Sequence, residues 1–329
     1  MKQFNFIFII FLLLFLSSYT FSQDIQFSHL QSTKLYMNPS FAGKEGIPNA
    51  VMGHRNFSPS NFGDYISHHV SFQKKSKILH GGIGFQLIND RQADGAINKI
   101  YGSGMYSYHF DISSNMKIQA GLEAKLAYFS VQDKDFTFPD MFDRYNWRMK
   151  DEGEYSYENL NDISDTYWEF NTGALFTYEK FMLRRYREFN VGVSVHHLNK
   201  PNAFFSKGDE KIDRRYSLYF DIEMLLVDRK SKSLIPILKP TVLLQQQGNV
   251  TTFHYGAFVE VSDLQFGLFL KHDRVFQYYK SIIFLGLDIS NMNVSYSYDA
   301  NLGSKMKKNP ISDAHEVTLS INFQYNRDK

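Results

Sequence analysis

The chain of 329 residues contains no cysteine, which excludes disulfide bonds, cysteine metal sites and thiol chemistry. Its eight prolines and 20 glycines are too few for a fibrous or disordered protein. Neither sign of charge dominates, and a formal net charge of +2 does not suit a nucleic-acid partner. Beyond the N-terminal segment, no apolar run approaches the roughly 20 residues that a helix needs to cross a bilayer.

The N-terminal segment has the order of a secretory signal peptide. A single lysine is followed by the apolar run Phe4–Leu16, and then by a small, polar stretch that suits a signal peptidase. We therefore expect residues 1–22 to be cleaved, so that Gln23 begins the mature chain and the protein is exported. An N-terminal membrane anchor is the alternative.

The rest of the chain alternates apolar and polar residues with a period of two. Near the C-terminus, for example, Val317, Leu319 and Ile321 share one face, with Thr318 and Ser320 on the other. The strand centres lie near Met52, His69, Phe85, Met105, Leu122, Ala174, Val193, Ile222, Val242, Ala257, Leu268, Leu285, Ser295 and Leu319.

A soluble β-sandwich would show the same alternation. The strand length of about 9 to 11 residues, the aromatic residues at strand ends and the predicted export favour a membrane protein. In lipid, only a closed barrel satisfies the backbone groups of every strand. We therefore expect an all-β fold, a transmembrane antiparallel up-and-down β-barrel of about 14 strands in the outer membrane.

The connections fall into two classes, and an even strand count places each class at one end of the barrel. Short turns in the periplasm are expected at Lys74 to Lys77, Asp111 to Asn115, Lys180 to Glu188, Asp228 to Ser233, Ser262-Asp263 and Ser290-Asn291. Long outer loops are expected at Asp133 to Tyr167, Asn199 to Arg215 and Ala300 to Ala314. The predicted organisation is a periplasmic segment 23–48, a barrel 49–325 and a tail 326–329.

The outer loop 133–167 is the most unusual segment. It contains ten acidic and four basic residues, a net charge of 4 − 10 = −6, together with several aromatic residues. This composition indicates a contact surface for a protein or for lipid headgroups bridged by divalent ions. A solvated loop that folds over the pore is the alternative.

Enzymatic signatures are missing from the chain. The segment Gly192–His196 lacks the final glycine of a hydrolase elbow, and Gly81–Gly84 lies within a strand rather than in a phosphate-binding loop. The pairs His68-His69 and His196-His197 point to opposite faces of their strands, so neither pair chelates one ion. We therefore expect no catalytic residue, no metal and no cofactor; an outer-membrane hydrolase is disfavoured.

Short motifs along the whole mature chain resemble the PorP/SprF family of type IX secretion system outer-membrane proteins in Bacteroidetes. The matching pieces are Gln23–Ser28, Leu35–Gly43, His54–Phe57, Gly82–Asp90, Asn190–Leu198, Tyr296–Asp299 and Ala314–Val317. The family-motif positions are Asn38, Pro39, Gly43, Arg55, Asp90, His196, Tyr298, Asp299, His315 and Glu316.

The resemblance implies a non-enzymatic component of the type IX machinery that supports secretion or surface attachment of adhesin-like cargo, with gliding motility in species that glide. Its implied partners are type IX components of the periplasm and outer membrane, and a secreted surface adhesin or other cargo with a C-terminal signal. The residues alone imply only the lipid bilayer as a partner.

A diffusion porin or hydrophobic-solute channel is the alternative function. Four aromatic residues predicted to face inward argue instead for a partly filled lumen: Phe129, Phe258, Phe269 and Phe284. The pair His315-Glu316 begins the last strand, and we expect it to pin the preceding outer loop.

Overall fold

The computed structural model describes residues 24–58, 63–132, 163–179, 186–202, 211–226, 235–276, 278–304 and 313–323. The predicted signal peptide, most of the acidic loop and the C-terminal tail lie outside these residues. In the described ranges, no helix is long and apolar enough to span a membrane.

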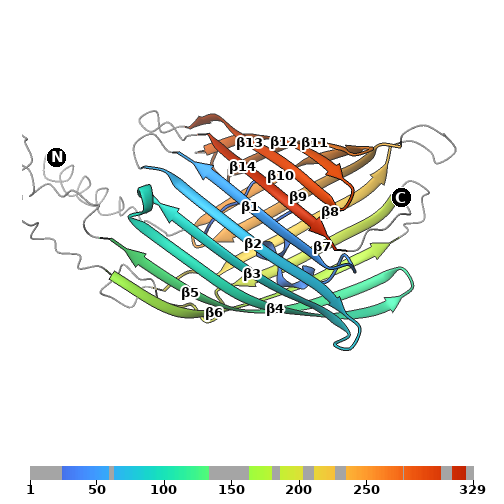
Figure 1. Ribbon diagram of the computed structural model, residues 1–329, viewed down its shortest axis with the longest axis horizontal. Helices are drawn as coiled ribbons and strands as arrows, with labels where there is room; N and C mark the ends of the chain where they lie inside the picture. Colours follow the sequence, from blue (N-terminus) through green and yellow to red (C-terminus); the bar gives the residue numbers. More distant parts are fainter. Residues whose placement is uncertain are drawn as a thin grey trace, which may run out of the picture.

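Within the described residues, fourteen antiparallel strands close into a barrel (Figure 1). Each strand pairs with its neighbours in sequence, and β1 pairs with β14. The strands are β1 (Asn49–Phe57), β2 (Tyr65–Ser76), β3 (Gly81–Gln92), β4 (Ile97–Ser113), β5 (Met116–Val131), β6 (Ile163–Glu179), β7 (Tyr186–His196), β8 (Arg215–Leu225), β9 (Ile237–Gln247), β10 (Val250–Val261), β11 (Leu264–Asp273), β12 (Tyr278–Ile289), β13 (Met292–Ser304) and β14 (Ala314–Asn322). Every predicted strand centre falls within one of them, so the predicted up-and-down barrel is confirmed.

The barrel has two different ends. The turn end, on the right of Figure 1, carries the connections after the even-numbered strands and the start of β1. The loop end, on the left, carries the connections after the odd-numbered strands. At the loop end, β6 already begins at Ile163, so residues 163–167, expected in the acidic loop, belong to a strand.

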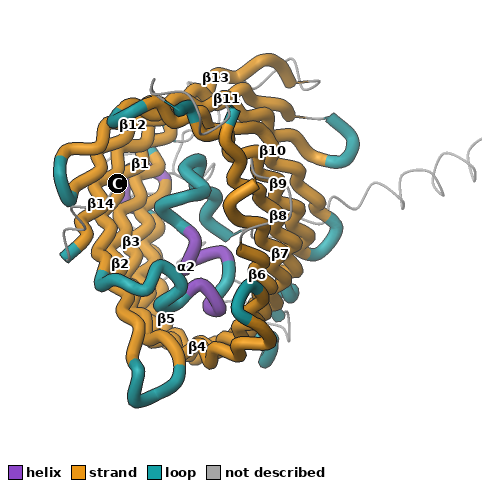
Figure 2. Tube along the Cα trace, turned by 90° about the vertical axis from the view of Figure 1, so that its right-hand side faces the viewer, coloured by secondary structure: helices purple, strands orange, loops and turns teal. Residues whose placement is uncertain are grey.

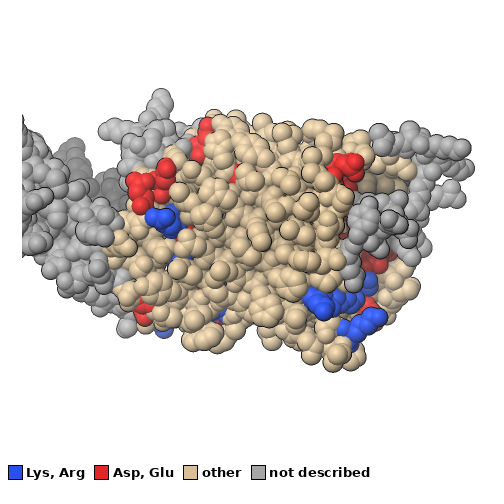
Figure 3. All heavy atoms as spheres, viewed as in Figure 1, with Lys and Arg blue, Asp and Glu red and all other residues tan. Residues whose placement is uncertain are grey.

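The face of the barrel in Figure 3 has a broad belt with few charged residues, between two ends that carry charged groups. In β11, Leu264, Phe266, Leu268 and Leu270 face outward and are exposed, whereas the intervening Phe269 is buried inside. Burying such residues in hydrocarbon is favourable, and barrel closure leaves no unpaired strand edge. The belt therefore suits the interior of a bilayer.

Candidate functional site: a folded segment inside the barrel

Residues 24–48, which the sequence pattern places in the periplasm, lie inside the barrel instead (Figure 2). This lumen segment contains the helix α2 (Lys34–Met37) and the 3-10 helix η1 (Pro39–Phe41). It runs from the loop end, where Asp24 lies, to the turn end, where β1 begins. The physical reason is burial, because its apolar side chains leave water when they enter the barrel.

The apolar part of the lumen segment packs against the inner wall. Leu35, Met37 and Phe41 belong to one buried cluster with wall residues that include Phe258, Phe269 and Phe284. Phe41 also contacts the Tyr219 ring edge to face, with ring centroids 5.4 Å apart. These three inward-facing phenylalanines therefore line a partly filled lumen, as the alternation predicts.

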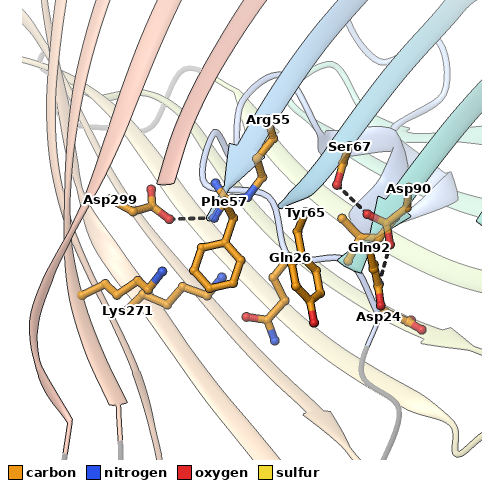
Figure 4. Close-up of a pocket in the computed structure, with 12 residues that line it drawn as sticks. Asp24, Gln26, Arg55, Phe57, Tyr65, Ser67, Asp90, Gln92, Lys271 and Asp299 are labelled. Carbon is orange, nitrogen blue, oxygen red and sulfur yellow. Dashed lines mark hydrogen bonds and ion pairs between the residues drawn. The ribbon is translucent and has the colours of Figure 1, made fainter. Parts of the chain in front are cut away.

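A buried ion-pair network holds the segment to the last two strands. Arg55 of β1 forms an ion pair with Asp299 of β13 at 2.8 Å (Figure 4). It forms a second ion pair with Glu316 of β14 at 3.1 Å. Ser28 of the lumen segment donates its backbone N–H to Glu316 at 2.8 Å and its hydroxyl to Asp299 at 2.7 Å. Both carboxylate side chains are completely buried, so this network joins three strands and the segment around one guanidinium.

A second network lies near the loop end, around the start of the segment. The Asp24 carboxylate lies 2.8 Å from both the Arg215 guanidinium and the His197 ring. Burial raises the pKa of Asp24, but these two partners outweigh it and hold the pKa well below its ordinary value. Burial lowers the pKa of His197, yet the carboxylates of Asp24 and Glu169 raise it to about 9. The start of the segment is thus fixed as a charged carboxylate between two cations.

Neutral hydrogen bonds fix the middle of the segment. The Asn38 amide donates to the backbone carbonyls of Ala174 in β6 and Val193 in β7, at 3.2 and 3.0 Å. The Nε2 atom of His196 lies 3.0 Å from the Met37 carbonyl oxygen and donates to it in the matching tautomer. These bonds satisfy buried polar groups that would otherwise be costly to bury.

Two wall glycines allow the backbone of the segment to approach. A Cβ atom on Gly121 would lie 2.6 Å from the Cα of Ser40, and one on Gly82 would lie 2.6 Å from the Cα of Gly43. Any other residue at these wall positions would overlap the segment. Gly43 itself has φ +70°, a conformation that side chains disfavour.

At the turn end, charged groups fasten the exit of the segment. Lys44 forms an ion pair with Glu188 of β7, and the backbone N–H of Gly43 donates to the Gln73 side chain at 3.1 Å. Lys34 and Lys44 lower the pKa of Glu45 to about 2. The segment is therefore held at both ends and in the middle.

The family-motif positions are mostly parts of this arrangement. Asn38, Pro39 and Gly43 belong to the lumen segment, and five wall positions face it or the space beside it: Arg55, Asp90, His196, Asp299 and Glu316. Asp90 accepts hydrogen bonds from Ser67 and Gln92, at 2.6 and 2.7 Å. Tyr298 and His315 face outward near the loop end instead, with contacts to Asp313 and Tyr296.

The expected role of His315-Glu316 in pinning the outer loop is wrong for Glu316. Adjacent strand residues point to opposite faces, so His315 lies outside while Glu316 binds Arg55 and Ser28 in the lumen. Sequence reasoning also missed the network role of several residues. These are Asp24 and Ser28 of the segment and Glu169, His197 and Arg215 of the wall. The signal in the sequence is that Asp24, Ser28 and His197 fall within the motifs that resemble the family.

Comparison with known proteins gives a family match and a set of solved barrels. The family profile described as "Type IX secretion system membrane protein PorP/SprF" matches residues 19–321. No curated protein matches the chain. The toluene transporter TodX of P. putida is 9% identical with a TM-score of 0.47, covering 88% of this chain and 93% of TodX. CdiB from Acinetobacter baumannii is 7% identical with a TM-score of 0.40, and the match covers 84% of this chain but only 60% of CdiB. These structural likenesses carry no argument about function.

Proposed function

Because the chain belongs to the PorP/SprF family of type IX secretion system membrane proteins, we propose that it is a non-enzymatic barrel that supports secretion or surface attachment of adhesin-like cargo. The protein is an outer-membrane β-barrel of the type IX system. Membership of that system implies contact with its other components. Gliding motility, in a species that glides, is part of the same proposal.

The observation that supports this role is the occupied lumen. A fourteen-stranded barrel encloses more space than the eight-stranded barrels that side chains alone fill. Here the lumen segment crosses that space from Asp24 at the loop end to Gly43 at the turn end. A diffusion porin needs a water-filled channel, whereas a barrel filled by its own chain suits a rigid platform for other proteins.

The proposal includes an orientation. We place the turn end in the periplasm, where Lys74, Lys75 and Lys77 form a basic surface for periplasmic partners. Cleavage before Gln23 would then leave the mature N-terminus at the loop end, next to Asp24 and facing the cell exterior. Tags inserted near Glu154 should label on intact cells, and tags near Lys75 should label only after the outer membrane is breached. The reverse pattern would contradict this orientation.

The functional test is deletion of the gene in the source bacterium, followed by quantification of type IX cargo on the cell surface. We expect loss of one or more surface adhesins, and their recovery with the wild-type gene. Uptake of small solutes through the outer membrane is the matched control and should not change. Normal surface cargo together with reduced solute uptake would instead favour the diffusion porin.

A tagged copy in native membranes provides the partner test. We expect type IX components or an adhesin to be recovered with it after mild solubilisation. The matched control is an unrelated outer-membrane barrel with the same tag. Recovery of the same proteins with both baits would argue against a specific role in secretion.

A further inference from the structure

A cavity of about 330 Å³ lies beside the lumen segment at the loop end of the barrel (Figure 4). Its rim is formed where strands begin and end, with Phe57 closing β1, Tyr65 opening β2 and Gln92 closing β3. A volume of this size is at the lower end of the range found for small-ligand sites. Its lining combines apolar groups, amides and charges, as binding sites do.

One wall of the cavity is cationic. Lys271 of β11 and Lys280 of β12 are direct cross-strand partners, and both line the cavity. They are only 6% and 8% exposed, respectively. Like charges placed opposite each other on a sheet repel, and buried charges are costly unless they are paired. The repulsion between the two ammonium groups therefore makes this wall a favourable place for an anion.

The two lysines differ in their contacts, because Lys280 has interactions of its own within the protein. The Lys280 ammonium lies 4.5 Å from the centre of the Phe57 ring, a cation–π contact. Lys271 has no carboxylate of the described residues within ion-pair distance, although the charge of Asp299 acts on it. Asp299 is the nearest acidic group of the lining on this side, and its carboxylate is held by Arg55 and Ser28. A buried ammonium group without an acceptor thus faces an open space.

The other acidic residues of the lining are committed elsewhere. Asp24 pairs with Arg215 and His197, and Asp90 accepts hydrogen bonds from neighbouring side chains across the cavity from Lys271. Their negative charges still act on anything that enters. A single negative charge held by the two lysines is therefore favoured over a phosphate dianion, which the nearby carboxylates would repel more strongly.

We propose that Lys271 and Lys280 bind the carboxylate of a ligand that enters from the loop end, with its apolar part against Ile25, Phe57 and Tyr65. The carboxylate satisfies the unpaired ammonium and relieves the cross-strand repulsion. Its source is either a small organic acid or the C-terminal carboxylate of a polypeptide. The site does not depend on the proposed role in secretion, because it rests on the barrel and the lumen segment alone.

Calorimetric titration of the full mature chain in detergent tests the proposal, with benzoate as the probe at constant ionic strength. We expect benzoate to bind and the uncharged benzamide not to bind. Lys271→Gln should weaken benzoate binding at least tenfold, and Lys271→Arg should retain it. The matched control is Lys239→Gln, which removes a lumen lysine already paired with Glu223 and Glu260 and should leave benzoate binding unchanged.

Two further titrations separate the sources and complete the test. The first titration compares the peptide Ala-Ala-Phe with a free C-terminal carboxylate and the same peptide with a C-terminal amide. Binding of the free carboxylate form, without binding of the amide form, identifies a polypeptide C-terminus as the ligand. Binding of benzoate without the peptide identifies a small organic acid. Phosphate binding tighter than either carboxylate would overturn the proposal. So would equal benzoate affinity in the wild type and Lys271→Gln, with both proteins showing the heat-dependent gel shift of a folded barrel.

Discussion

The Arg55 guanidinium pairs with both Asp299 and Glu316 in the lumen, at 2.8 and 3.1 Å. An Arg55→Ala substitution removes the ion-pair partner of two buried carboxylates, and Ser28 still donates a hydrogen bond to each. Removing one partner of a buried ion pair costs about 3–5 kcal/mol. We expect a loss near the upper end of that range, because two carboxylates are stranded at once. Urea unfolding in lipid vesicles, followed by tryptophan fluorescence and gel mobility, measures it.

The matched control is Lys117→Ala at the turn end. Lys117 lies 2.6 Å from Glu179, but both side chains are about one-third exposed, at 33% and 34%. Such pairs contribute only about 0–1 kcal/mol, so this variant should remain close to the wild type. Combining Arg55→Met with neutral Asn and Gln at the two carboxylates should recover much of the loss. If Arg55→Ala costs no more than Lys117→Ala, the reasoning about the buried network is wrong.

Three further predictions concern the segment and the outer surface. Burial lowers the pKa of His197, but its two carboxylate partners raise the pKa to about 9. The charged ring therefore stabilises the folded barrel fully below pH 6.5, and this stabilisation is lost as the pH rises through 9. His197→Gln should flatten the dependence of unfolding free energy on pH in this window. Gly121→Val places side-chain atoms against Ser40, and should release the segment so that a protease cleaves within residues 24–48 of the reconstituted barrel. Phe323→Asp puts a charge on an apolar, 58% exposed position and should lower the fraction of heat-modifiable, assembled barrel by several-fold.

Each of these predictions has an outcome that contradicts it. An unchanged pH profile in His197→Gln would mean that the Asp24 contact does not stabilise the folded barrel. Protection of residues 24–48 in Gly121→Val would show that the wall glycine is not needed for the approach of the segment. Normal assembly of Phe323→Asp would place this position outside the hydrocarbon layer.

The strands were predictable because their pattern is local. Each strand has one face toward lipid and one toward the lumen, so alternation such as that of Leu268 and Phe269 can be read without knowing its neighbours. The start of β6 was less predictable, since strands that extend beyond the bilayer lose the apolar half of the pattern. Residues 163–167 are polar enough to resemble a loop, although they pair with β5.

The lumen segment could not be predicted from periodicity. Its helices α2 and η1 are too short to show a repeat, and its contacts join residues far apart in the chain, such as Ser28 and Glu316. The sequence contains one signal: Leu35, Met37 and Phe41 are apolar, although they lie in a stretch that was predicted to be in the aqueous periplasm. The inward-facing phenylalanines of the wall need apolar groups to pack against. The closed barrel shows that Leu35, Met37 and Phe41 provide these groups.

Single-channel recording tests the central claim most directly, because a lumen occupied by residues 24–48 leaves little room for ions. The full mature chain in planar bilayers should show no steady porin-like conductance, and a variant lacking residues 24–46 should conduct. A stable, large conductance from the full chain, unchanged when the segment is removed, would contradict the claim that the lumen segment fills the barrel.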